Sequence, residues 1–319
     1  MGALLALASA AVFGAADFTG GYATRKTPIL TVTLIANVAA LFIAAAIVAV
    51  VGGVWTPRTV GWSAAAGVCG LTGITFLYLG LAQGPHRIVS PMTAVVSAII
   101  PVVFGLITQG LPDLRVAIGI ALAAPAIWLV AGGDGAPDGD GDGDGDLGAR
   151  PAGYLDADHG KDASTVGPVD PAMSDVVASG SGTGRFDQRA LKLTLAAGLG
   201  FGLFFVCMAQ TGDDAGAVPL IVAKATSTIV VVVVAYVRRR HMTRPNGLGL
   251  PILAGTLDMT ANGLFLAATR HGDLATVGAL TNLFPVTTVL LAVIVLRERL
   301  TLPQVAGLLL AITAAALLS

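Results

Sequence analysis

Apolar residues occur along the chain in blocks of about twenty, separated by short stretches rich in Gly, Pro and charged residues. A block of this length can cross a hydrocarbon core of roughly 30 Å as an α-helix, which satisfies its backbone hydrogen bonds internally. The pattern predicts ten transmembrane helices, at about residues 2–23, 28–51, 61–83, 88–109, 114–132, 190–211, 216–237, 248–269, 273–295 and 302–319. The predicted fold class is therefore an all-α polytopic membrane protein.

Composition supports this prediction and excludes other classes. Of the 319 residues, 55% are hydrophobic and 12% are charged, and the mean hydropathy is +0.82. A soluble chain carries about 25% charged residues, so a soluble enzyme, a nucleic-acid-binding protein and a secreted disulfide scaffold all fit poorly. Cys69 and Cys207 lie in apolar blocks and the four histidines are scattered over loops, so neither a metal site nor a cofactor is predicted.

One long polar segment interrupts the pattern between the fifth and sixth blocks. Residues 134–187 contain 12 of the 19 acidic residues, all of them Asp, among many Gly, Ser and Pro residues. Such a segment cannot bury enough apolar surface to offset its chain entropy, so it is predicted to be a disordered linker. It divides the chain into a first five-helix unit at 1–133 and a second at 188–319.

The two units resemble each other in sequence. Phe13-Gly14 matches Phe201-Gly202, and the segment 97–102, which contains Pro101, matches 281–286, which contains Pro285. Because each unit has an odd number of spans, the second copy is expected to enter the bilayer upside down relative to the first. Inverted repeats of this kind are common in secondary transporters, whose substrate site lies near the bilayer midplane between the repeats.

Loop charge predicts an orientation. Fourteen Lys and Arg residues fall on the side that holds the linker, and three fall on the side of the termini. The positive-inside rule therefore places the linker in the cytoplasm and both termini outside, in a multi-pass protein of the plasma or inner membrane.

The second unit also resembles a known family. A hairpin of two spans runs from Phe265 to the mid-span Pro285, and the segment 298–307 reads Glu-Arg-Leu followed by Gln-x-x-Gly at the start of the last helix. This pattern is similar to the EamA-type transporters of the drug/metabolite transporter superfamily, and the first unit contains a weaker copy. The first unit departs from the family pattern at residues 111–114, where members often have Glu-Arg-Leu, and at Asn37, where members frequently have Arg. Members of the family mostly have both termini in the cytoplasm, whereas the charge count of this chain places both termini outside.

The resemblance implies a carrier rather than an enzyme. Such a carrier moves a small metabolite or drug, amino-acid-like or another small organic solute, by alternating access and is coupled to protons or another gradient. Its expected partners are the lipid bilayer and a small-molecule substrate, and no nucleic acid is expected. Protons and a second copy in a homodimer are left open as further partners. The alternative is a non-transporting membrane sensor or scaffold that uses the acidic linker as its interaction arm.

Three ionisable residues lie inside predicted spans. Asp17, Lys224 and Asp258 each cost roughly 2.5–3.5 kcal/mol to place at bilayer depth, so such residues usually face a cavity or a partner. In a functional interpretation, Asp258 or Asp17 exchanges a proton against substrate. In a structural interpretation, Asp258 and Lys224 form an ion pair that joins the seventh and eighth spans.

Other polar and kinked positions complete the predicted site. Asn262 lies one helical turn after Asp258, and it joins Asn282 and Tyr78 as a substrate-contact candidate, with interhelical hydrogen bonding as the alternative. Pro101 and Pro285 each remove a backbone donor in mid-span, which predicts a kink and makes both hinge candidates.

Overall fold

The structure is a computed structural model that describes residues 1–24, 27, 29–83, 86–110, 112–131, 188–237, 247–296 and 300–319. The predicted linker at 134–187 lies outside these ranges, as do the basic residues at 25–26, 238–240, 244, 297 and 299. The predictions that concern the linker and these loops therefore remain predictions.

The described residues form helices and no strands. The first part of the chain contains α1 (Gly2–Thr24), α2 (Ile29–Val51), α3 (Pro57–Gln83), α4 (His86–Gln109) and α5 (Leu114–Ala131). The second contains α7 (Gln188–Ala209), the short 3-10 helix η2 (Asp213–Ala215), α8 (Val218–Val237), α9 (Gly249–Thr269), α10 (Leu274–Thr281), α11 (Phe284–Leu296) and α12 (Leu302–Leu318). Each predicted apolar block is thus helical, and the all-helical class is confirmed.

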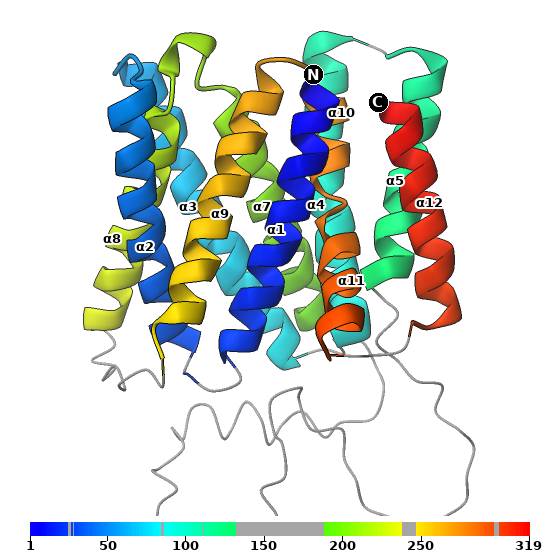
Figure 1. Cartoon of the computed structure of the whole chain (residues 1–319), viewed down its shortest axis with the longest axis horizontal. Coiled ribbons are helices and arrows are strands. Elements are labelled where there is room, and N and C mark those ends of the chain that lie inside the picture. Colours follow the sequence, from blue (N-terminus) through cyan, green and yellow to red (C-terminus); the bar gives the residue numbers. More distant parts are fainter. Residues whose placement is uncertain are drawn as a thin grey trace, which may run out of the picture.

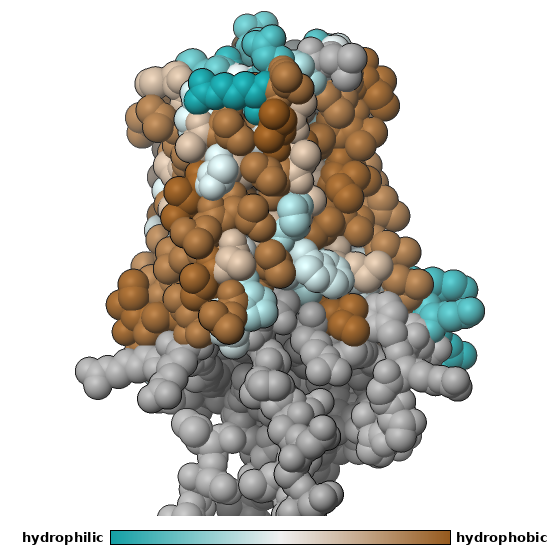
Figure 2. Space-filling model, turned by 90° about the vertical axis from the view of Figure 1, so that its right-hand side faces the viewer, coloured by the Kyte–Doolittle hydropathy of each residue, from teal (hydrophilic) through white to brown (hydrophobic). Residues whose placement is uncertain are grey.

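Most of these helices suit a bilayer. Within the described ranges, eight are long and apolar enough to cross a membrane, with α10 and α11 counted as the single segment Leu274–Leu296, and two further apolar helices, Val218–Val233 and Leu302–Leu318, are shorter. Large apolar side chains such as Phe42, Ile107 and Ile294 are more than 70% exposed. Figure 2 shows one side of the bundle, where hydrophobic residues cover most of the surface below a hydrophilic end. Such a surface is stable against lipid, so the chain is a multi-pass membrane protein.

The helices of the two parts interleave. The most extensive packing joins α1 to α9, α3 to α7 and α5 to α12, so each of these pairs combines one helix from before the linker with one from after it. In Figure 1 both termini lie at the same end of the bundle, and α1 and α9 lie side by side. A cluster of aromatic rings links three of these helices, because Phe205 on α7 contacts both Phe13 on α1, at a centroid distance of 6.1 Å, and Phe265 on α9, at 4.7 Å.

Glycine allows the closest helix crossings. A Cβ added at Gly200 on α7 would lie 2.7 Å from the Cα of Gly73 on α3, and one added at Gly255 on α9 would collide with the carbonyl oxygen of Ala36 on α2. Small residues at such crossings let helix backbones approach within a bilayer, where no hydrophobic effect drives helices together. The second of these crossings holds α9 against α2, which positions the polar residues of α9.

The two mid-span prolines behave differently. Pro285 lies at the second residue of α11, directly after a break at Asn282 and Leu283 that separates α10 from α11. Pro101 lies within the uninterrupted helix α4. Pro101 packs against α10, since a Cβ added at Gly278 would lie 2.9 Å from the Pro101 ring.

Candidate transport site

An ion pair joins α8 to α9 at the level of the middle of α9. The ammonium of Lys224 donates a hydrogen bond to Oδ2 of Asp258 at 2.6 Å. The Lys224 side chain is 18% exposed and that of Asp258 is 35% exposed, so the pair is only partly covered. The two charges predicted inside neighbouring spans therefore lie in direct contact, and each provides the counter-charge of the other.

Asn262 extends this pair by one helical turn. Its Nδ2 donates to the backbone oxygen of Asp258 at 2.7 Å and lies 3.3 Å from Oδ1 of the same residue. Its Oδ1 is buried and has no hydrogen-bond partner among the described residues, and the whole residue is only 5% exposed. A buried amide oxygen without a donor is costly, so this atom is a notable feature of the site.

Asp17 brings a second carboxylate close to the first. It lies on α1, which packs along α9, and its carboxyl group is near enough to Asp258 for electrostatic repulsion between the two. The residue is exposed at the bundle surface, and no salt bridge joins it to another residue in the described ranges. Four of the predicted residues, Asp17, Lys224, Asp258 and Asn262, are thus assembled from α1, α8 and α9.

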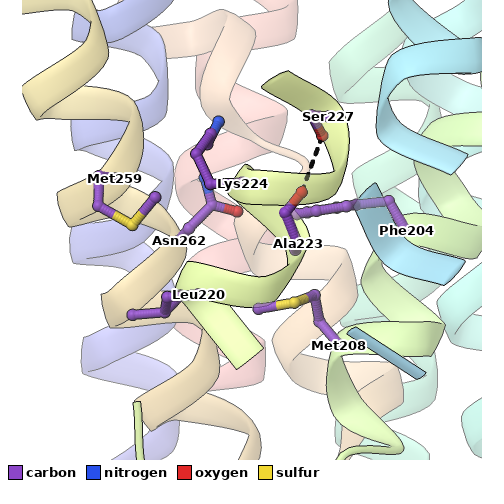
Figure 3. Close-up of a pocket in the computed structure, with 8 residues that line it drawn as sticks. All are labelled: Phe204, Met208, Leu220, Ala223, Lys224, Ser227, Met259 and Asn262. Carbon is purple, nitrogen blue, oxygen red and sulfur yellow. Dashed lines mark hydrogen bonds between the residues drawn. The ribbon is translucent and has the colours of Figure 1, made fainter. Parts of the chain in front are cut away.

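A small pocket lies directly beside the ion pair. Its cavity volume is about 30 Å³, and it is lined by Phe204, Met208, Leu220, Ala223, Lys224, Ser227, Met259 and Asn262. These residues come from α7, α8 and α9, and in Figure 3 the side-chain oxygen of Asn262 points toward the space that they surround. The pocket thus joins three polar side chains, those of Lys224, Ser227 and Asn262, to an apolar wall.

Sequence reasoning missed the apolar wall of this pocket. Phe204, Met208, Leu220 and Met259 stand in apolar spans and have no sequence signal that separates them from lipid-facing residues. Only two of the four had any signal, which was their spacing from the charged residues: Met259 follows Asp258, and Leu220 precedes Lys224 by one turn. Within the described ranges, no group of three or more His, Cys, Asp or Glu side chains could hold a metal ion.

Of the other predicted contact residues, Asn282 does not line this pocket. Asn282 is fully buried at the break between α10 and α11, where its Nδ2 donates to the Gly278 carbonyl at 2.8 Å. Its Oδ1 accepts a hydrogen bond from the Ser97 hydroxyl of α4 at 2.7 Å. Both ends of the amide are therefore satisfied by protein, as in interhelical hydrogen bonding. Tyr78 belongs to α3, and its side chain lies outside the described part of the chain.

Replacing Ser97 with alanine is expected to lower the free energy of unfolding by about 1 kcal/mol, because Oδ1 of Asn282 then has no donor inside a buried helix crossing. Thermal unfolding of the detergent-solubilised protein measures this change. The matched control is Thr313→Ala, which removes an exposed hydroxyl that bonds only within α12. Equal shifts for the two variants would contradict a structural role for the Ser97–Asn282 bond.

The long apolar helices define a multi-pass membrane protein, with a small pocket among α7, α8 and α9. Residues 188–319 match the EamA-like transporter family, which belongs to the drug/metabolite transporter superfamily. The resemblance drawn from the sequence is thereby confirmed for residues 188–319. Proteins of this family are typically not enzymes.

Structural comparison covers the rest of the chain. A solved structure titled "Crystal structure of protein" is similar to this one with a TM-score of 0.64 and 15% sequence identity, over 99% of this chain and 94% of that one. At this identity the likeness concerns the fold alone. No curated protein matches the sequence.

Proposed function

We propose that the protein is a secondary transporter that moves a small metabolite or drug across the cell membrane by alternating access. The observation that carries the proposal is the ion pair Lys224–Asp258, with Asn262 and Asp17 beside it, next to a pocket among apolar helices. Ionisable groups inside membrane spans are expensive to insert and usually mark the path of a substrate or ion. The match of residues 188–319 to a transporter family supports the same function.

The proposed architecture is ten spans arranged as two inverted repeats, 1–133 and 188–319, joined by the linker 134–187. Equivalent glycine contacts support it: a Cβ at Gly67 would collide with the carbonyl of Ala223, and one at Gly255 would collide with that of Ala36. The glycines are 255 − 67 = 188 residues apart and the alanines 223 − 36 = 187, which agrees with the sequence offset between the halves. In Figure 1 both termini lie at one end of the bundle and successive spans alternate in direction, so α1 and α7 run antiparallel.

The two carboxylates are proposed to couple transport to protons. Asp258 already has Lys224 as its counter-charge, whereas Asp17 adds a second negative charge nearby without a salt bridge to another described residue. Two carboxylates and one ammonium have a net charge of −1 when both acids are ionised. One bound proton removes that charge, so proton uptake and release at Asp17 or Asp258 is a natural partner for the movement of a substrate.

The broken ninth segment is the proposed bending element. Transporters commonly place discontinuous helices beside their binding sites. The interruption at Asn282 and Leu283 separates two apolar helices, and Pro285 prevents their hydrogen-bond ladder from closing. Pro101, which faces Gly278 across this crossing, is the second hinge candidate. The linker and the basic loops are proposed to lie on the cytoplasmic side, as the charge count predicts.

Replacing Asp258 with asparagine is expected to reduce transport to background, since the amide can neither pair with Lys224 nor carry a proton. The measurement compares metabolites in cells and medium for wild type, Asp258→Asn and a strain without the protein, at equal amounts in the membrane. The control variant is Thr260→Val, an exposed position two residues along α9. A metabolite redistributed by wild type and Thr260→Val alone supports the proposal. The same redistribution by Asp258→Asn would remove Asp258 from the mechanism, and no redistribution by wild type would contradict transport.

A further inference from the structure

We infer that two loops close the bundle as a gate at the end where both termini lie, and that Arg270 holds this gate shut. The loops are residues 52–54, between α2 and α3, and residues 211–217, between α7 and α8. The inference rests on the proposed transport function, because alternating access requires a barrier at one end of the path at a time. It follows from the backbone contacts between the loops, the position of the second loop at the pocket and the contacts of Arg270.

The two loops of the gate are joined through their backbones. The N–H of Val54 donates to the carbonyl of Asp214 at 3.0 Å, and the N–H of Ala217 donates to the carbonyl of Gly52 at 2.9 Å. One loop comes from the helices before residues 134–187 and the other from the helices after them. The gate therefore joins the two units of the chain at one end of the bundle.

Glycine allows the two loops to approach this closely. Gly53 has a φ of +149° and Gly216 a φ of +53°, a region that residues with a side chain rarely adopt. A Cβ at Gly53 would collide with the carbonyl of Ala215, and one at Gly216 would collide with that of Gly52. Alanine at either position would consequently force the loops apart.

The second loop covers the termini side of the pocket. Met208 and Leu220 both line the pocket, and the chain that connects them contains this loop. The Thr211 hydroxyl donates to the Met208 carbonyl at 2.8 Å, and the N–H of Leu220 donates to the Ala217 carbonyl at 3.1 Å. Thr211 and Ala217 are each 3% exposed, whereas Asp258, nearer the middle of the bundle, is 35% exposed. The site is thus covered toward the termini while its charged pair remains partly exposed.

Arg270 holds the second loop from the C-terminal end of α9. Its Nη2 donates a hydrogen bond to the carbonyl of Gly216. Partial burial lowers the pKa of the Arg270 guanidinium, and the Asp213 carboxylate of the same loop opposes this lowering. The Nε of Arg270 is buried and has no hydrogen-bond partner in the described ranges, which is unfavourable.

This arrangement connects the gate to the charged site. Arg270 is the C-cap of α9, the helix that also carries Asp258. A movement of α9 when the ion pair opens would therefore move the guanidinium away from the loop. The buried Nε without a partner lowers the cost of that release, because opening the gate exposes this donor to water.

Access from the termini side measures how well the gate seals the bundle. A reporter cysteine replaces the fully buried Met208 in a protein that also carries Cys69→Ala and Cys207→Ala. The rate of its reaction with the membrane-impermeant thiol reagent MTSET is measured in intact cells and in inverted membrane vesicles. A separate cysteine at Ser319, which lies at the same end of the bundle, identifies the preparation that exposes this end.

Arg270→Gln and Gly53→Ala are each expected to raise the reaction rate of the reporter from this side tenfold or more. Arg115→Gln is the matched control, because Arg115 also donates to a backbone carbonyl at this end, that of Ala316, but joins α5 to α12. Equal rates in Arg270→Gln and Arg115→Gln would overturn the role of Arg270. A reporter that reacts as fast as the Ser319 cysteine before any gate substitution would overturn the gate itself.

A covalent bridge across the gate tests whether it must open. Val54→Cys/Asp214→Cys in the same cysteine-free background is treated with o-phenylenedimaleimide, which joins neighbouring thiols, and placed in vesicles with a trapped pH-sensitive dye. We expect the bridge to form and to abolish the pH change caused by the small-metabolite filtrate of a cell extract, while each single-cysteine variant keeps it. Failure to bridge, or an undiminished pH change after bridging, would overturn the inference. If unmodified protein gives no pH change while the MTSET rates differ as expected, the transport function falls and the seal stands.

Discussion

A protein that carries Lys224→Met and Asp258→Leu together is expected to be more stable than either single variant and to transport nothing. Each single substitution leaves one charge among apolar helices without its partner, which costs about 1–3 kcal/mol for a partly covered ion pair. The double variant removes both charges and replaces them with apolar side chains of similar size. Its free energy of unfolding should therefore return to within about 1 kcal/mol of wild type.

Unfolding in detergent is monitored through the fluorescence of the three tryptophans. It gives the free energy of unfolding of wild type, the two single variants and the double variant. The same preparations, reconstituted into vesicles, show whether transport returns with stability. A double variant whose loss equals the sum of the two single losses would contradict direct pairing of the charges. A double variant that regains transport would show that the pair serves only to hold α8 and α9 together.

Replacing Gly255 with alanine is expected to destabilise the protein by about 2–3 kcal/mol, because the added methyl group would collide with the Ala36 carbonyl and push α9 away from α2. Alanine at Gly67 should act in the same direction, through the collision with Ala223 at the α3–α8 crossing. The two positions are equivalent in the proposed repeats, so similar losses are expected from both.

Gly61→Ala is the matched control, because no atom lies within 4 Å of a Cβ at this position of α3. Alanine favours a helix over glycine by about 1 kcal/mol, so this variant should equal or exceed the stability of wild type. Unfolding temperatures in one detergent measure the three variants side by side. A Gly255→Ala protein as stable as Gly61→Ala would mean that α2 and α9 do not cross as closely as described.

The helices were predictable from the sequence because the bilayer requires long apolar segments with internally bonded backbones. Their ends were also largely predictable, although α3 begins at Pro57 rather than near residue 61. The break between α10 and α11 was not, because Pro101 and Pro285 stand in similar sequences while only Pro285 adjoins an interruption. The difference lies in the surroundings: Asn282 and Ser97 bond across the helices, which no local pattern reveals.

The charged part of the site was predictable for a related reason. Charges inside apolar spans are rare and costly, so Asp17, Lys224 and Asp258 stood out before their contacts were known. Asn262 followed from its spacing of one turn from Asp258. The apolar wall did not stand out, because Met208 and Leu220 resemble many other apolar residues until the packing of α7 against α8 and α9 is known. Asn282, equally polar, proved to bond within the protein instead of facing this pocket.

The most direct test of a proton-coupled transport site at Asp258 uses vesicles that contain the purified protein and a trapped pH-sensitive dye. The small-metabolite filtrate of a cell extract is added outside, and the internal pH is followed at equal protein content. Wild type is predicted to change the internal pH on addition of the filtrate, and Thr260→Val should do the same. Asp258→Asn is predicted to match vesicles without protein. A pH change of equal rate in wild type and Asp258→Asn, or none in wild type, would contradict the account.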